Sequence, residues 1–133
     1  MPFTPPLTSA AFAVFFGLFG VFLTVRVVLN RVKFKIVGTD GGHAPLIRAI
    51  RAHGNFTEQT PLALILLTLA ELIRAPHLAI LLLGTLLVIA RILSFWGITH
   101  LDTATRAREA GAGMTMFYHV ALCLVICYTL CFG

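Results

Sequence analysis

Two arginines, an asparagine and a glutamate recur at helical spacing in one short stretch: Arg48, Arg51, Asn55 and Glu58. On an α-helix, which turns about 100° per residue, these four side chains lie within an arc of about 80° on one face. Arginine forks bind carboxylates through paired hydrogen bonds and stay charged at any relevant pH. The asparagine and the glutamate add acceptors for an ammonium or amide group. Together they predict a site for a small zwitterionic peptide.

This stretch leads directly into an apolar run from Leu62 to Leu69. Charges carried to membrane depth cost free energy, so they indicate a functional site by default. The alternative is a basic flank with one surface glutamate. The composition supports a membrane setting, since 59% of the 133 residues are hydrophobic and 11% are charged, against about 25% charged in soluble domains. Because each membrane-spanning helix uses about 20 residues, the length allows one compact unit.

Hydropathy predicts an all-α integral membrane four-helix bundle in a single domain over residues 1–133. The expected helices cover approximately residues 7–30, 44–73, 77–100 and 110–132. Two basic connections join the first helix to the second and the third to the fourth. The positive-inside rule predicts that both face the cytoplasm, with both termini periplasmic. Topology therefore explains the net charge of +5, and we expect no nucleic-acid partner.

Arg91 is the one charge within the third apolar run. It follows the turn at Pro76 by some 15 residues, or roughly 22 Å of helix, which brings it to the level of the Arg48–Glu58 stretch. A buried arginine needs an anion or carbonyl groups, and Glu58 is the natural candidate. The alternative is that Arg91 extends to the lipid headgroups.

Two further patterns concern the first and last helices. Small residues recur on the first at near-helical spacing and suit close contact with a neighbouring helix: Ala10, Ala13, Gly17, Gly20 and Thr24. In the last helix His119 starts a row of every fourth residue that continues with three cysteines. One straight helix cannot wrap four ligands around an ion, so we expect no metal site.

The stretch Arg48-Ala-Ile-Arg-Ala-His-Gly-Asn-Phe-Thr-Glu58, followed by Pro61, resembles the second-helix signature of the MAPEG family, the membrane-associated proteins in eicosanoid and glutathione metabolism. Ala90-Arg91-Ile-Leu looks like a second family motif on the third helix. The resemblance covers essentially the whole chain and points to the small bacterial branch. It implies a homotrimer with glutathione as co-substrate, held between subunits at the cytoplasmic side.

The resemblance also implies roles for individual residues. Either Arg106 or Arg108 would stabilise the glutathione thiolate, and either Arg26 or Arg31 would fill the basic position of the first helix. This sequence departs from studied members at Ile47, where they carry an acid, and at Gly54, where an arginine is common. The glutathione-binding positions would be Arg31, Arg48, Arg51, Asn55, Glu58 and Arg91.

The leading expectation is a glutathione-dependent transferase or peroxidase-like enzyme of the bacterial inner membrane. Its second substrate would be an apolar electrophile that enters from the lipid. The alternative is a non-catalytic protein of the same fold that binds anionic lipid or another small anion, since basic pockets at the cytoplasmic face hold anionic headgroups. Partners on either interpretation are membrane lipids and other copies of the chain.

Overall fold

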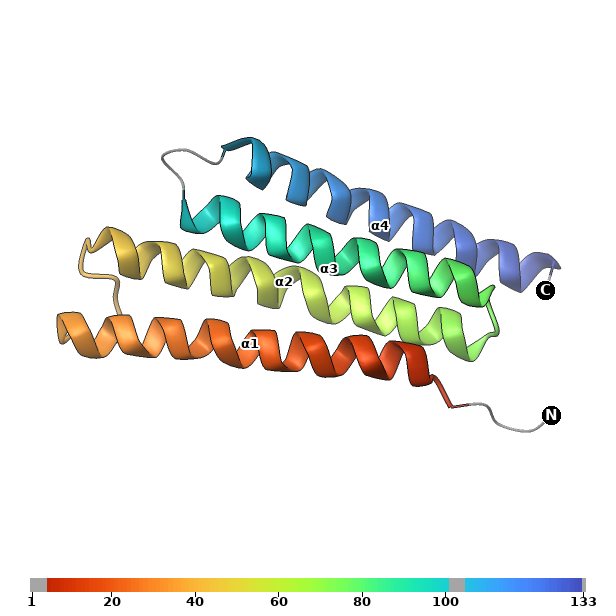
Figure 1. Cartoon of the computed structure of the whole chain (residues 1–133), viewed down its shortest axis with the longest axis horizontal. Coiled ribbons are helices and arrows are strands. Elements are labelled where there is room, and N and C mark those ends of the chain that lie inside the picture. The colour runs from red at the N-terminus through yellow and green to blue at the C-terminus, as the bar shows by residue number, and fades with distance from the viewer. Residues whose placement is uncertain (1–4, 101–104, 133) are drawn as a thin grey trace.

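The computed structural model describes residues 5–100 and 105–132, and in this part the chain forms four long α-helices (Figure 1). Regular structure in the described ranges is entirely helical, so the predicted all-α fold is confirmed. The helices are α1 (Leu7–Phe34), α2 (Ala44–Leu72), α3 (His77–Thr99) and α4 (Thr105–Phe132).

Two helices reach further into the basic segments than predicted. α1 ends at Phe34 rather than near residue 30, and α4 begins at Thr105 rather than near residue 110. Arginine and lysine are good helix formers. Arg31 and Lys33 in the last turn of α1 also oppose the negative end of the helix dipole. These basic residues therefore extend the helices instead of forming loops.

The four helices run side by side along the long axis of the molecule (Figure 1). α1 packs chiefly on α2, and α4 packs most extensively on α3. The 35–43 connection and the first turn of α4 lie at one end, which we call the polar end. The 73–76 turn lies at the opposite end, the turn end, where α1 begins and α4 finishes.

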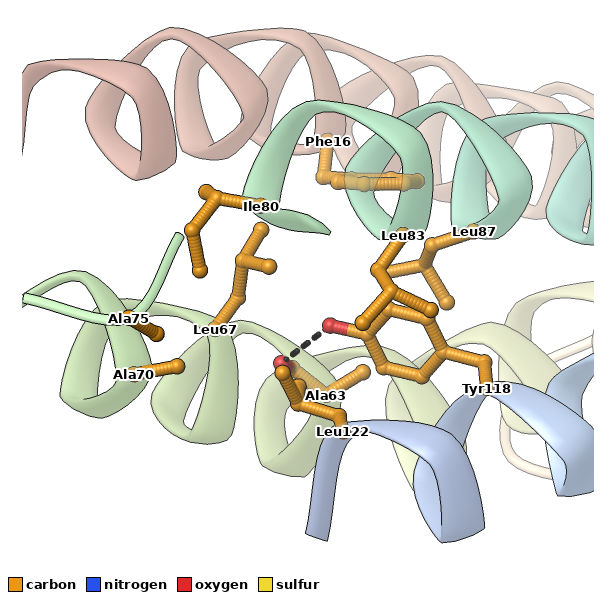
Figure 2. Close-up of a cluster of buried hydrophobic side chains, with 10 residues drawn as sticks. All are labelled: Phe16, Ala63, Leu67, Ala70, Ala75, Ile80, Leu83, Leu87, Tyr118 and Leu122. Atoms are coloured by element: carbon orange, nitrogen blue, oxygen red, sulfur yellow. Dashed lines mark hydrogen bonds between the residues drawn. The ribbon is translucent and has the colours of Figure 1, made fainter. Parts of the chain in front are cut away.

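The main core joins all four helices between the middle of the bundle and the turn end (Figure 2). Tyr118 of α4 is fully buried there, and its hydroxyl donates a hydrogen bond of 2.8 Å to the carbonyl oxygen of Ala63 in α2. Burying that hydroxyl without an acceptor would cost free energy. The other members are apolar: Phe16, Leu67, Ala70, Ala75, Ile80, Leu83, Leu87 and Leu122.

The start of α1 is fixed by a carboxylate from α2. Glu71 accepts hydrogen bonds from the backbone N–H groups of Thr8 and Ser9, at 3.0 and 2.7 Å, and from the Ser9 hydroxyl at 2.5 Å. The first N–H groups of a helix have no partner within the helix, and a negative charge is favourable there. Glu71 therefore attaches the first turn of α1 to the turn end of α2.

The outer surface of the bundle is apolar. Leu18, Val32 and Leu124 are each 66–70% exposed, as expected where lipid replaces water. Among the described residues α1, α3 and α4 are long and apolar enough to cross a membrane. α2 is not among these three, because its first half carries the polar stretch. α2 nevertheless matches its neighbours in length and lies alongside them.

Candidate functional site

A cavity of about 380 Å³ opens near the polar end, between α2, α3 and α4. α2 supplies half of its lining at helical spacing, so that one face of the helix forms a wall. α3 and α4 each add two residues one turn apart. The lining consists of Arg51, Gly54, Asn55 and Glu58 from α2, Ser94 and Ile98 from α3, and Arg108 and Ala112 from α4.

Close packing of α3 on α4 brings Arg108 to this cavity. A Cβ atom on Gly97 would lie 2.5 Å from the backbone nitrogen of Arg108. A Cβ atom on Gly111 would lie 2.5 Å from the Ser94 hydroxyl and 2.7 Å from the backbone nitrogen of Ser94. Glycine lets the two backbones approach at both points, as small residues do in membrane helix pairs. The two glycines therefore set where the first turns of α4 lie.

The cavity lining carries two guanidinium groups and one carboxylate. Arg51, Arg108 and Glu58 are all exposed. No ion pair joins any of them to another residue in the described ranges 5–100 and 105–132. The cavity thus has one excess positive charge, and its charged groups are available to a ligand.

Asn55 is held from behind by Arg91, which is only 2% exposed. The Arg91 Nη1 donates to the Asn55 side-chain oxygen at 3.2 Å and to its carbonyl oxygen at 3.4 Å. Nη2 donates to the hydroxyl of Ser94 at 3.3 Å and to that of Thr115. Arg91 therefore fixes two residues of the cavity lining without lining the cavity itself.

The predicted pairing of Arg91 with Glu58 is not formed in the described structure. The guanidinium bonds neutral oxygens instead, and its Nε has no partner among the described residues. The predicted depth of Arg91 is nevertheless right, because it reaches the same level as Asn55. Glu58 lies one turn further along α2, on the cavity side.

Two arginines expected at the site lie outside the cavity, at the end of α3. Arg48 donates from Nη1 to the carbonyl oxygen of Thr99 at 3.4 Å. Arg26 donates to the Thr99 hydroxyl at 3.3 Å, and its guanidinium carbon lies 4.9 Å from the centre of the Phe95 ring. Carbonyl groups at a helix C-terminus have no intrahelical partner and attract cations. Arg26 and Arg48 thus hold the end of α3.

The two remaining candidates also fall outside. Arg31, at the end of α1, donates to the carbonyl oxygen of Thr39 at 3.1 Å. Arg106 is exposed in the first turn of α4 and does not line the cavity, whereas Arg108 does. The structure therefore brings Arg51, Asn55, Glu58 and Arg108 together, with Arg91 behind them.

Sequence reasoning missed Ser94 and Thr115, which hold Arg91. Ser94 follows Arg91 by three residues, which places both on one helix face, so this signal was present. Thr115 belongs to another helix, and nothing local marks it. Its hydroxyl also donates to the carbonyl oxygen of Gly111 at 2.7 Å, a bond that any helical threonine can form.

Four helices with apolar outer surfaces and a cationic cavity near one end define a small integral membrane protein with one candidate binding site in the cavity described. The sequence matches the MAPEG family over residues 9–128. A 109-residue segment is 30% identical to the inner membrane protein YecN of Escherichia coli (strain K12), covering 82% of each chain. The protein of the same name from Escherichia coli O6:H1 (strain CFT073) matches equally well. The chain belongs to the MAPEG family, as its second-helix signature predicted.

Proposed function

We propose that this protein is a glutathione-dependent transferase or peroxidase-like enzyme of the bacterial inner membrane, acting on an apolar electrophile. The observation that carries the proposal is the cavity, where Arg51 and Arg108 approach from two different helices and Glu58 completes the charge pattern. The inner membrane is inferred from the name of the Escherichia coli relative.

The charges of glutathione complement those of the cavity. At neutral pH the tripeptide carries two carboxylates and one ammonium group, a net charge of about −1. Arg51 and Arg108 match the carboxylates or the sulfur, and Glu58 matches the ammonium group. Asn55, held by Arg91, offers a fixed amide to the peptide backbone. The volume of about 380 Å³ lies within the usual range for small-ligand sites, roughly 300–1,000 Å³.

Arg108 is the candidate for activating the thiol. A guanidinium beside a thiol favours the thiolate and so lowers the thiol pKa, and the thiolate is the nucleophile. A lone pair of the thiolate sulfur would form a carbon–sulfur bond with the electrophile. The bonding electrons displaced from the electrophile would depart with the leaving group or, in an addition, take up a proton. Exposed apolar side chains on the surrounding helices give an electrophile dissolved in lipid access to the protein.

Assembly as a homotrimer is part of this proposal. The small-residue stripe on α1 is largely unused within the chain, since Ala10, Ala13 and Gly17 are exposed. A Cβ atom added to Gly17 would meet nothing within 4 Å. Gly20 is different, because a Cβ atom added there would lie 3.1 Å from the ring of Phe56 in α2. The exposed part of the stripe therefore suits close contact with a helix of a second copy.

The test is a titration of the detergent-solubilised protein with glutathione, following the ultraviolet absorbance of the thiolate. We expect saturable binding and a thiolate signal that Arg108→Gln abolishes. Arg106→Gln is the matched control, since it removes an equal charge two residues away and outside the cavity. No binding at millimolar glutathione, or equal signals from both variants, would contradict the proposal.

The non-catalytic alternative gives a different result in the same preparation. A phospholipid held in the cavity would co-purify, and salt would displace it while glutathione would not. Release of bound lipid by glutathione in proportion to the thiolate signal supports the enzyme. Release by salt alone, without a thiolate signal, supports a binding protein.

A further inference from the structure

His119 is an ionisable side chain of α4 for which the proposed function has no role so far. It lies in the interior of a stretch, Arg106–Phe132, that is long and apolar enough to cross a membrane. Its neighbours Met116, Phe117 and Val120 are apolar and 61–71% exposed. An ionisable group at membrane depth costs free energy, so its presence indicates a function.

His119 continues the wall that α4 gives to the cavity. Arg108 and Ala112 line the cavity, and the spacing along the helix places His119 within about 40° of both. His119 is half-buried and follows Ala112 by about 10 Å toward the turn end. The next residue back, Tyr118, points elsewhere, into the core, where its hydroxyl bonds Ala63 (Figure 2).

A hydrogen bond directs the imidazole of His119 back toward the cavity. Its Nδ1 lies 2.8 Å from the carbonyl oxygen of Thr115, one turn earlier on α4. The Thr115 hydroxyl accepts a hydrogen bond from Arg91, and Arg91 also donates to Asn55, which lines the cavity. The imidazole therefore lies beside the turn of α4 that is level with Asn55.

The same hydrogen bond determines which ring nitrogen is able to react. A carbonyl oxygen only accepts, so Nδ1 of His119 carries the hydrogen, and in the neutral ring Nε2 holds a lone pair. Within residues 5–100 and 105–132 Nε2 forms no hydrogen bond. His119 is thus oriented by its own helix, with Nε2 able to take up a proton and pass it on.

We propose that His119 donates a proton to an apolar electrophile whose displaced atom is oxygen, such as an epoxide or a hydroperoxide. This inference rests on the glutathione-dependent activity proposed above and narrows its second substrate. An alkoxide leaves readily only when an acid protonates it, which is the task of a positioned imidazolium. Chloride, in contrast, departs as a stable anion and needs no proton.

The proton transfer accounts for every atom and electron pair. With an epoxide, the thiolate sulfur bonds carbon, the carbon–oxygen bond breaks, and the oxygen keeps the electron pair. That oxygen takes the proton from Nε2 of the His119 imidazolium, which regains one from the solvent that received the thiol proton. With a hydroperoxide, the sulfur bonds the terminal oxygen and the O–O bond breaks. The sulfur is oxidised to a sulfenic acid, and the peroxide is reduced to an alcohol.

The test compares turnover of styrene oxide, cumene hydroperoxide and chlorodinitrobenzene by the detergent-solubilised protein with glutathione. His119→Gln should lower kcat/KM about 100-fold with the first two, the usual scale of general acid catalysis, and change it less than about two-fold with the chloride. Glutamine keeps an N–H donor for the carbonyl group of Thr115 but cannot carry the proton. Turnover of the chloride also reports that the variant is folded.

His100→Gln is the matched control. The Nδ1 of His100 also lies close to a carbonyl oxygen four residues earlier, that of Trp96 at 3.1 Å, but His100 stands at the end of α3 and outside the cavity lining. This variant should leave all three activities unchanged. His119→Ala provides a second measurement, because added imidazole should restore turnover of styrene oxide if the lost group is a proton donor.

The outcomes separate this inference from the proposed function. Equal losses of His119→Gln with all three electrophiles overturn the inference, and so does unchanged turnover of the two oxygen electrophiles. If the unaltered protein turns over the chloride alone, the glutathione-dependent activity holds and the role of His119 is overturned. If it gives neither a thiolate signal nor any turnover, the proposed function fails and this inference fails with it.

Discussion

Two glutamates on α2 show how differently the two ends of the bundle use charge. Glu71, at the turn end, has both oxygens occupied by hydrogen bonds from the start of α1. Glu58, about 20 Å earlier along the same helix, is exposed at the cavity and forms no hydrogen bond within the part of the chain that the structure describes. The first carboxylate stabilises the fold, and the second is free to meet a ligand.

The arginines divide in the same way. Arg26 and Arg48 bond the end of α3, and Arg91 bonds side chains of α2, α3 and α4. Arg51 and Arg108 reach the cavity without an ion pair in the described ranges. The arginines that donate hydrogen bonds within the protein stabilise the helices. The arginines that line the cavity without an ion pair mark the candidate site.

The largest effect is expected from Gly111→Ala. Its Cβ atom would approach the backbone of Ser94 to 2.7 Å, and backbone cannot move aside as a flexible side chain does. We expect a loss of about 3 kcal/mol in the free energy of unfolding, typical of overpacking at a close helix contact. Denaturant unfolding in detergent measures it. Gly113→Ala is the control, since nothing lies within 4 Å of its Cβ position, and it should not destabilise the protein.

Glu71→Ala should cost about 2 kcal/mol of stability, because hydrogen bonds to a charged group are among the stronger ones. Glutathione affinity should stay unchanged. Glu58→Ala should do the reverse, changing stability by less than about 0.5 kcal/mol while weakening glutathione binding. The free energy of unfolding and the glutathione affinity, measured on both variants, check these opposite effects. If Glu58→Ala destabilises the protein as much as Glu71→Ala, the distinction between the two ends is wrong.

Arg91→Met tests whether a buried cation acts through its neighbours. Methionine fills a similar space but donates no hydrogen bond, so some loss of stability is expected from the buried oxygens that lose their donor. Asn55 would lose its anchor, so we expect glutathione affinity to fall about ten-fold, equivalent to about 1.4 kcal/mol. Isothermal titration of the variant and of Asn55→Ala should give similar losses. Unchanged affinity would show that Arg91 does not position Asn55 for the ligand.

Gly54→Arg should have the smallest effect, and it should be a gain. Gly54 lines the cavity, and a Cβ atom there would meet nothing within 4 Å. An added guanidinium would strengthen binding of an anionic tripeptide by about five-fold, the scale of a partly exposed charge pair of about 1 kcal/mol. Gly54→Ala, which adds no charge, should leave affinity unchanged. An equal gain in both variants would point to helix propensity instead.

Much of the fold was predictable from the sequence, because helices and their polar faces follow from local periodicity. The arc formed by Arg51, Asn55 and Glu58 does form one wall of a cavity, and Arg91 lies at their level. The helix limits were less accurate, since Phe34 and Thr105 lie in segments whose charge suggested loops. Charge alone does not separate a solvated helix end from a connection.

Only the packing of the helices determined which of their faces are in contact. Arg106 and Arg108 are alike in sequence, and the approach of Gly97 to the backbone of Arg108 decides which of them reaches the cavity. Arg48 shares the arc of Arg51 but donates a hydrogen bond to the carbonyl group of Thr99 on another helix. Spacing along one helix determines which side chains share a face. The neighbour that this face meets depends on contacts between residues far apart in the chain, and these exist only once the helices have packed.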